Sequence, residues 1–240
     1  MQYPTQTPSA YLFGGTHPWT PTDWTSTDDR VRGGSSHSYL SINSTTNAAT
    51  FHGTLDITTL GGAGFASQRT TTTSHTWDLT PYAGLEISVP HSDGKKYTLT
   101  LKDELLPRRP DGRERSGLVW EYDFVAQKGG EVLRVRWEDF APTFRGREAK
   151  GAKPLDLGGV RRVGIMVRSF FGEQEGEFEL VVESIKGFGK GKSTGKAKEE
   201  RYRDDPDAGG EDEEFSEKGW GEMRSERRGG LGWFSCCGLF

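Results

Sequence analysis

Apolar and polar residues alternate along most of the first 188 positions of the chain. The clearest runs with an apolar residue at every second position are Leu85 to Val89, Tyr97 to Leu101, Leu118 to Phe124, Leu133 to Trp137, Ile165 to Val167 and Phe178 to Val182. This period of two is typical of strands that bury one face. HSYLSIN and ATFHGTLDI have the same character, and no long run has the period of a helix. The pattern predicts an all-β fold of about nine antiparallel strands, a β-sandwich or jelly roll.

The composition changes near Gly189. The segment that follows, GKGKSTGKAKEERYRDDPDAGGEDEEFSEKG, joins a basic block to an acidic block and contains almost nothing to bury. A segment of this kind cannot offset the entropy that folding removes, so it is expected to be disordered. We therefore divide the chain into an extended lead-in (1–23), a β-sandwich domain (24–188) and a disordered charged tail (189–240).

The segment GGAGFAS begins like a dinucleotide-binding loop. Gly62 and Gly64 match the first two glycines of that fingerprint, but the third position is Ser67. The fingerprint also needs a helix whose N-terminus holds the pyrophosphate, and the β-branched residues that follow favour a strand. The sequence predicts a glycine turn leading into a strand.

The sequence offers no clear catalytic or metal-binding constellation. The 5 histidines have no short spacing to one another or to a cysteine, so neither a metal nor another cofactor is expected. Asp28-Asp29 and Asp103-Glu104 are adjacent carboxylates, and we interpret them as solvated loop acids rather than as an acid/base pair. The sequence therefore predicts a protein that is not an enzyme.

Aromatic and basic residues supply the candidate binding groups. Trp120 and Trp137 keep the phase of apolar strand faces and are expected in the core, whereas Trp19 and Trp24 either cover a sheet edge or form a binding platform. The loop PRRPDGRER is either solvated or a local basic contact site. The formal net charge of -4 gives no general attraction to nucleic acid.

A series of segments resembles the complex I intermediate-associated protein 30 family. In the order of that family, they are DDRVRGGSS, ATFHGTLDI, GGAGFASQRT, WDLTPYAGLEISV, GKKYTLTLKDE, VRWEDFAPTFRGR, LDLGGVRRVGIMV and GEQEGEFELVVESIKGF. The resemblance covers the chain from about Trp24 to Phe188. It implies a galactose-binding-like β-sandwich and a non-catalytic role in assembling mitochondrial respiratory complex I, with complex I subunits or assembly intermediates as partners.

Two arginines of the matching segments are candidate binding residues. Arg69 and Arg145 are charged groups within apolar or glycine-rich surroundings. Each is expected either to pair with a buried carboxylate or to present a binding group at one end of the sandwich. An alternative for the whole domain is a carbohydrate- or small-ligand-binding module, which rests on analogy of fold and would place Trp19 or Trp24 beside a polar cleft.

The last four residues, Cys237 to Phe240, have the form of a CaaX prenylation signal. Cys236 offers a second acylation site, and two lipid anchors are what stable membrane attachment requires. We expect a tethered scaffold on the cytosolic face of a membrane if this signal is used, and a mitochondrial protein if the family role holds. The N-terminus lacks the Arg-rich pattern of a mitochondrial presequence. The alternative is that the two thiols end the tail by chance or that the apolar tip docks on the sandwich.

Overall fold

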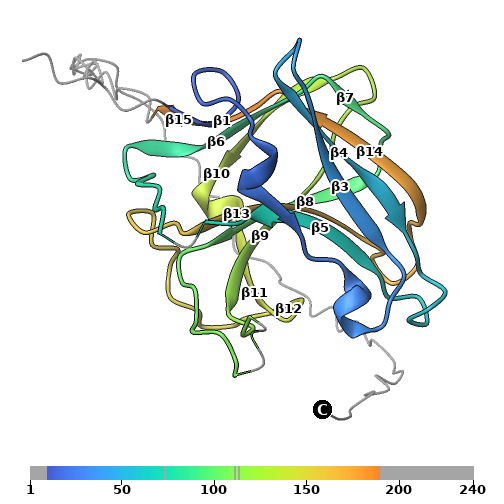
Figure 1. Cartoon of the computed structure of the whole chain (residues 1–240). Helices are drawn as coiled ribbons and strands as arrows, with labels where there is room; N and C mark the ends of the chain where they lie inside the picture. Colours follow the sequence, from blue (N-terminus) through green and yellow to red (C-terminus); the bar gives the residue numbers. More distant parts are fainter. Residues whose placement is uncertain (1–9, 73, 111, 113, 190–240) are drawn as a thin grey trace, which may run out of the picture. The chain divides into compact units, whose positions relative to one another are not determined.

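The computed structural model describes residues 10–189 except 73, 111 and 113 (Figure 1). Residues 1–9 and 190–240 lie outside the described part of the chain. The predicted disorder of the tail and the predicted lipidation of Cys236 and Cys237 therefore stay predictions.

The described chain forms strands joined by turns, with three short 3-10 helices, η1 (Pro21–Asp23), η2 (Asp29–Arg32) and η3 (Trp137–Asp139). The strands are β1 (Tyr11–Phe13), β2 (Trp24–Ser26), β3 (His37–Asn43), β4 (Ala48–Leu55), β5 (Phe65–Thr70), β6 (Tyr82–Val89), β7 (His91–Ser92), β8 (Lys96–Lys102), β9 (Leu118–Val125), β10 (Glu131–Arg136), β11 (Ala141–Phe144), β12 (Arg147–Glu148), β13 (Arg162–Arg168), β14 (Gly176–Val182) and β15 (Ser184–Gly189). They form a seven-stranded sheet, β12-β11-β9-β8-β13-β5-β2, and two four-stranded sheets, β1-β15-β6-β10 and β3-β4-β14-β7. The strand pairs are antiparallel, which confirms the predicted β-sandwich.

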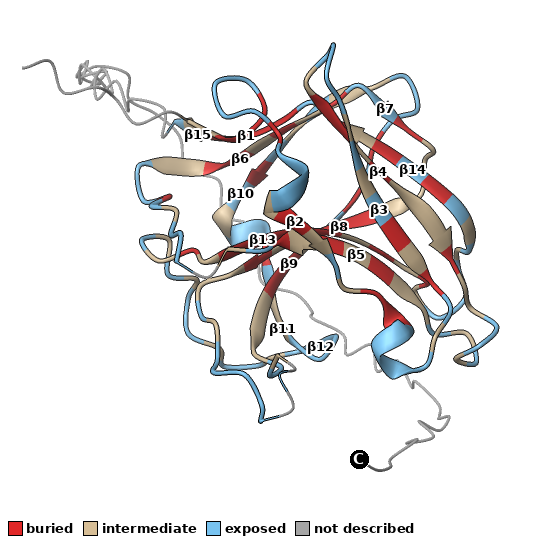
Figure 2. Cartoon of the chain, in the orientation of Figure 1, coloured by how far each residue is buried: buried red, intermediate tan, exposed pale blue. Residues whose placement is uncertain are grey.

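The core lies between the seven-stranded sheet and the two four-stranded sheets. Buried side chains alternate with more accessible ones in strands such as β5 and β14, as the period-two pattern predicts (Figure 2). Tyr97 on β8 contacts Phe51 on β4 and Phe178 on β14, with ring centroids 6.1 and 6.5 Å apart. Phe13 on β1 contacts Trp24 on β2 at 4.8 Å. Both four-stranded sheets therefore pack on the same face of the seven-stranded sheet and leave its other face open.

The sandwich begins before the predicted boundary at residue 24. β1 pairs with β15, and residues Leu12 and Phe13 are buried in the core. β15 in turn pairs with β6, so it is an inner strand that occupies the end of the predicted domain. The lead-in (1–23) was predicted to be extended, and among its described residues Leu12, Phe13 and Trp19 are buried in the core.

The prediction that Asp28 and Asp29 are solvated loop acids is wrong. Their exposed fractions are only 3% and 1%. Asp28 accepts hydrogen bonds from the Ser38 hydroxyl (2.6 Å) and the Ser67 backbone N–H (3.0 Å). Asp29 accepts them from the Ser36 N–H (3.0 Å), the Ser36 hydroxyl (2.6 Å) and the Phe65 N–H (3.1 Å). The two carboxylates tie the loop after β2 to β3 and β5, because buried charge must be matched by donors.

The glycine segment before β5 is a turn that leads into a strand, as predicted. Gly61 and Gly62 have φ of +64° and +93°, which lies in the left-handed region that favours glycine. Gly64 is required for space instead, since an added Cβ would lie 2.1 Å from the Asp56 carbonyl oxygen. The turn delivers the start of β5 to the Asp29 carboxylate and sets the position of the outward residues of β5.

Candidate functional site

The open face of the seven-stranded sheet, which we call the outer face, carries the charged side chains of its inner strands. Val163, Ile165 and Val167 of β13 point into the core, so Arg162, Met166 and Arg168 point outward. The register pairs Arg162 with Lys102 of β8, and Gly164 with Arg69 of β5. Alternation and register therefore bring Arg69, Lys102 and Arg162 together at one end of the outer face.

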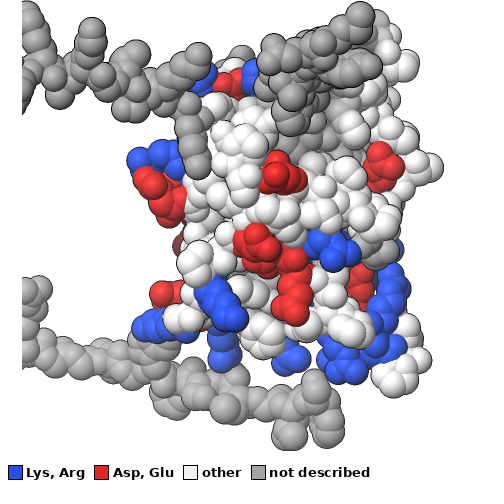
Figure 3. Space-filling view, turned by 90° about the vertical axis from the view of Figure 1, so that its left-hand side faces the viewer, with Lys and Arg blue, Asp and Glu red and all other residues white. Residues whose placement is uncertain are grey.

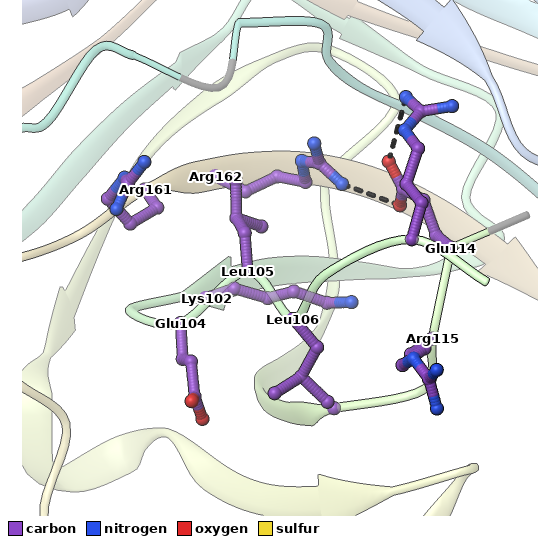
Figure 4. A pocket seen from close by; sticks show the side chains of 10 residues that line it. Lys102, Glu104, Leu105, Leu106, Glu114, Arg115, Arg161 and Arg162 are labelled. Atoms are coloured by element: carbon purple, nitrogen blue, oxygen red, sulfur yellow. Dashed lines mark hydrogen bonds and ion pairs between the residues drawn. The ribbon is translucent and has the colours of Figure 1, made fainter. Parts of the chain in front are cut away.

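A cavity of about 220 Å³ lies at this end of the outer face. Its lining includes Lys102, Arg108, Arg115, Arg161 and Arg162, the carboxylates Glu104 and Glu114, and the apolar side chains of Leu105 and Leu106. We call it the basic pocket. Figure 4 shows the Lys102 side chain extending into the space between Glu114 and Leu106, while Glu104 points away from it.

Glu114 bridges the arginines of the basic pocket. Its Oε1 lies 3.1 Å from Nη2 of Arg69, and its Oε2 accepts a hydrogen bond of 2.7 Å from Nη1 of Arg162. Arg108 lies 3.7 Å from the same carboxylate. Arg162 is almost fully buried, whereas the Glu114 side chain is 30% exposed. A single carboxylate, on the loop between β8 and β9, thus forms ion pairs with three arginines.

The pKa values of three groups at the basic pocket depart from their ordinary values. Burial and repulsion from Arg162 lower the pKa of Lys102, and the same two effects lower the pKa of Arg69. Burial acts to raise the pKa of Glu114, but attraction to Arg69 and Arg162 outweighs it and lowers that pKa. The positive charges are therefore only partly neutralised within the pocket.

A second hollow, of about 600 Å³, adjoins the basic pocket along the outer face. We call it the aromatic cleft. Its lining includes Phe65, Val119, Met166, Phe170 and Phe171, together with Glu121, Asp123, Arg145 and Arg168. Arg168 donates to Glu121 at 2.8 Å and to both oxygens of Asp123 at 2.7 Å. The charged groups at the centre of the cleft are therefore already paired with one another.

The aromatic rim of the cleft is held by an unusual backbone. Phe170 and Phe171 have φ of +45° and +63°, a region that bulky residues rarely adopt. Lys96 and Arg168 lie 4.3 and 4.7 Å from the centroid of the Phe170 ring, which is the geometry of a cation–π contact. Phe171 is 98% exposed. In this turn the Phe170 ring therefore packs against Lys96 and Arg168, and the Phe171 side chain extends into solvent.

Trp19 and Trp24 do not form an exposed platform. They are 4% and 6% exposed, and they pack against Phe13 at ring-centroid distances of 5.1 and 4.8 Å. The indole N–H of Trp19 donates to the Glu183 carbonyl. Of the two interpretations of these tryptophans, the geometry favours the one in which they cover the sheet edge, because a platform needs an exposed ring face.

The structure brings Arg69 and Arg145 to the outer face but to different hollows. Arg69 pairs with Glu114 beside the basic pocket and donates from Nε to the Thr27 hydroxyl at 2.8 Å. Arg145 is exposed at the rim of the aromatic cleft, with its guanidinium 5.4 Å from the Phe144 ring centroid. The pairing expected of Arg69 is therefore present with a half-buried carboxylate, and Arg145 is left accessible to a ligand.

Sequence reasoning missed Lys102, Glu114, Arg162 and Phe171 as members of the site. The outward phase of β8 and β13 identifies Lys102 and Arg162, but only the register shows that they lie opposite each other. The loop PRRPDGRER was the available signal for Arg108 and Arg115, as a local basic contact site. In Figure 3, Lys and Arg side chains gather along the lower edge of the face shown, with acidic side chains nearer its centre.

No group of three or more His, Cys, Asp or Glu side chains within 10–189, with 73, 111 and 113 set aside, is arranged to hold a metal ion. In the same part of the chain, no helix has the length and apolar character needed to cross a membrane.

Comparison with known proteins gives likenesses to solved structures and a relative in sequence. The family 11 carbohydrate-binding module of a Clostridium thermocellum cellulosomal cellulase is 14% identical, covers 75% of this chain and 93% of its own, and has a TM-score of 0.48. A family 11 module from the same organism, in complex with a β-1,3-1,4-mixed-linked tetrasaccharide, is 16% identical, with coverages of 70% and 89% and a TM-score of 0.47. An uncharacterized protein of Schizosaccharomyces pombe is 42% identical over 184 residues, which span 75% of this chain and 84% of the relative.

The sequence profile of one family covers most of the described domain. The match extends over residues 12–182, from β1 to the end of β14, and includes every strand of the outer face. It also includes the loop that carries Glu114 and the turn that carries Phe171. The chain therefore belongs to the complex I intermediate-associated protein 30 family.

Proposed function

We propose that this protein is a non-catalytic binding module that associates with assembly intermediates of respiratory complex I, and that it contacts its protein partner through the outer face. The description of its family supports the choice of partner. The partner surface is proposed from the structure, because both four-stranded sheets pack on the opposite face and leave the outer face available.

The observation that carries this proposal is the exposed Phe171 at the rim of the aromatic cleft. A phenylalanine that is 98% exposed gains hydrophobic free energy when a partner buries its ring. Its left-handed backbone adds a further cost, and such strain persists at sites where it serves binding. Aromatic side chains are enriched at protein interfaces and often act as their anchors.

The chemistry of the cleft supports binding rather than catalysis. Both oxygens of Asp123, and Oε2 of Glu121, accept hydrogen bonds from Arg168. These carboxylates are held as fixed ion pairs, which suits a surface that recognises shape and charge.

The surface is tested by replacing Phe171 with asparagine. Asparagine tolerates the left-handed backbone, so Phe171→Asn should fold with unchanged or slightly higher stability. We expect the variant to co-purify with complex I intermediates at least about tenfold less well, as for loss of an aromatic anchor worth about 2 kcal/mol. The matched control is Val132→Asn, which removes a side chain that is 58% exposed on β10, in one of the four-stranded sheets. Equal co-purification of the two variants would show that the outer face is not the partner surface.

The choice of complex I is tested separately by deleting the gene and separating mitochondrial membrane complexes on native gels. Loss of complex I, or accumulation of its intermediates, is the expected result. Normal levels of complex I and of its intermediates would refute this role while leaving the binding surface open to another partner.

The carbohydrate-binding alternative has less support. It was expected to place Trp19 or Trp24 as an exposed platform beside a polar cleft, but both are buried. A glycan array with Phe171→Asn as the matched control tests it, since a sugar bound in the aromatic cleft would stack on the exposed ring. The scaffold alternative, with the protein tethered through Cys236 and Cys237, depends on residues outside the described part of the chain.

A further inference from the structure

The basic pocket brings like charges close together on neighbouring strands. Arg162 and Lys102 are directly opposite each other across β13 and β8, and like charges in such a pair are destabilising. Arg69 lies on the next strand, beside Gly164. A pair with one acidic member would have been more stable, so the arrangement indicates a purpose other than stability.

Glu114 neutralises only part of this charge. It accepts from Arg162 and pairs with Arg69, as described above, whereas the Lys102 ammonium has no hydrogen bond or ion pair to any residue that the structure describes. Even with Arg161 set aside, the described lining of the pocket holds four cations, Lys102, Arg108, Arg115 and Arg162, and two carboxylates, Glu104 and Glu114. Burial and repulsion from Arg162 lower the pKa values of Lys102 and Arg69, while attraction to Glu114 acts to raise both.

The space next to Lys102 has the size and chemistry of an anion site. The hollow of about 220 Å³ is lined on one side by the apolar side chains of Leu105 and Leu106. Figure 4 shows the Lys102 side chain extending into this space with Arg115 at its far side. The pocket therefore combines a compact ammonium with planar guanidinium donors.

We propose that the basic pocket binds the phosphate group of a phosphate monoester, and that Glu114 occupies the arginine donors until the phosphate arrives. A monoester carries close to two negative charges at neutral pH and three acceptor oxygens. Arginine forks recognise such a group through paired hydrogen bonds, and lysine adds a point charge. Lys102 and Arg115 bind the incoming oxygens, and the phosphate then replaces the Glu114 carboxylate at Arg162.

The proposal is tested on the full-length protein by isothermal titration with O-phosphoserine, with succinate as a dicarboxylate of similar charge. We expect O-phosphoserine to bind more tightly than succinate. Lys102→Gln should weaken binding of O-phosphoserine by about tenfold or more, because it removes one charge-assisted hydrogen bond. Glu114→Gln should strengthen it several-fold, because it removes the competing carboxylate. The matched control is Lys96→Gln, on the same strand and the same face, which should leave binding unchanged.

A parallel measurement identifies the source of the phosphate. Vesicles of phosphatidylcholine with and without phosphatidic acid are sedimented with the protein and with the same variants. Lys102-dependent binding of either O-phosphoserine or phosphatidic acid vesicles supports the site and assigns the phosphate to a soluble ligand or to a lipid headgroup. Absence of binding in both assays, an equal loss in Lys96→Gln, or equal affinity for succinate would overturn the proposal. The inference relies on the proposed role of the outer face as a binding surface but not on the choice of complex I as partner. Because these assays use purified protein, their failure would refute the phosphate site without bearing on association with complex I.

Discussion

The buried Asp29 carboxylate gives the sharpest prediction about stability. Its Oδ1 accepts from the Ser36 N–H at 3.0 Å, and its Oδ2 accepts from the Phe65 N–H at 3.1 Å. Asparagine has the same shape but only one acceptor oxygen. In either orientation of the amide, the Asp29→Asn variant therefore turns an NH2 group toward a buried N–H donor.

The size of the effect follows from these contacts. A hydrogen bond to a charged acceptor is worth about 1.5–3 kcal/mol, and a buried donor left without a partner costs about 1–3 kcal/mol. The neutral amide recovers part of this loss because it is easier to bury than a carboxylate. We therefore expect Asp29→Asn to lower the free energy of unfolding by about 2–3 kcal/mol, with Asp29→Ala lower still.

The assay is equilibrium unfolding in urea, followed by tryptophan fluorescence. For an m value of about 2 kcal/mol per molar urea, the expected loss lowers the midpoint by about 1–1.5 M with m unchanged. The matched control is Asp78→Asn. Asp78 also accepts hydrogen bonds from a neighbour, Thr80, but is exposed, so water replaces the lost contact. If the two variants shift the midpoint equally, burial of Asp29 does not govern its contribution.

Three further predictions follow from the glycine turn and the basic pocket. In thermal unfolding, Gly64→Ala should lower the midpoint temperature more than Gly62→Ala does. The Cβ of an alanine at position 64 would lie 2.1 Å from a carbonyl oxygen, whereas an alanine at position 62 meets no atom and only adopts an unfavourable φ, which costs about 1 kcal/mol. Lys102→Gln should leave the free protein as stable or more stable in urea at pH 7, because the lowered pKa of Lys102 means that folding disfavours its charge; a clear loss of stability would contradict this. Glu114→Gln should cost about 1–2 kcal/mol at pH 7, less than a fully buried pair because Glu114 is 30% exposed. The pKa of Glu114 is lowered in the folded protein, so its contribution to the free energy of unfolding is complete above the unfolded pKa of about 4.3 and is lost as the pH falls through the folded value. The urea midpoints of the Glu114→Gln variant and the unchanged protein should therefore converge in acid.

The strands were predictable because their information is local. A residue such as Leu99 or Ile165 shows by its phase alone which side of a strand it occupies, and the structure buries both. The glycine turn before Phe65 was predictable for the same reason, since φ preferences are set by neighbouring residues. Trp137 marks the limit of this reasoning, because it continues the period of β10 but begins η3.

Features that depend on contacts between distant segments were not predictable. Asp28 and Asp29 look like loop acids until the Ser38, Ser67 and Phe65 groups that surround them are brought together by the fold. The basic pocket depends in the same way on register, because Lys102 and Arg162 are 60 positions apart and meet only across β8 and β13.

The central claim is that the outer face contacts a partner in complex I assembly, and site-specific crosslinking tests it most directly. A photo-crosslinking phenylalanine analogue replaces Phe171 on the outer face, or Val132 on β10, in otherwise unchanged protein within cells. The account predicts that the analogue at 171 gives a product containing a complex I subunit, which migrates with an assembly intermediate on a native gel, and that the analogue at 132 does not. A complex I subunit captured at 132 but not at 171, or at neither position, would contradict the claim.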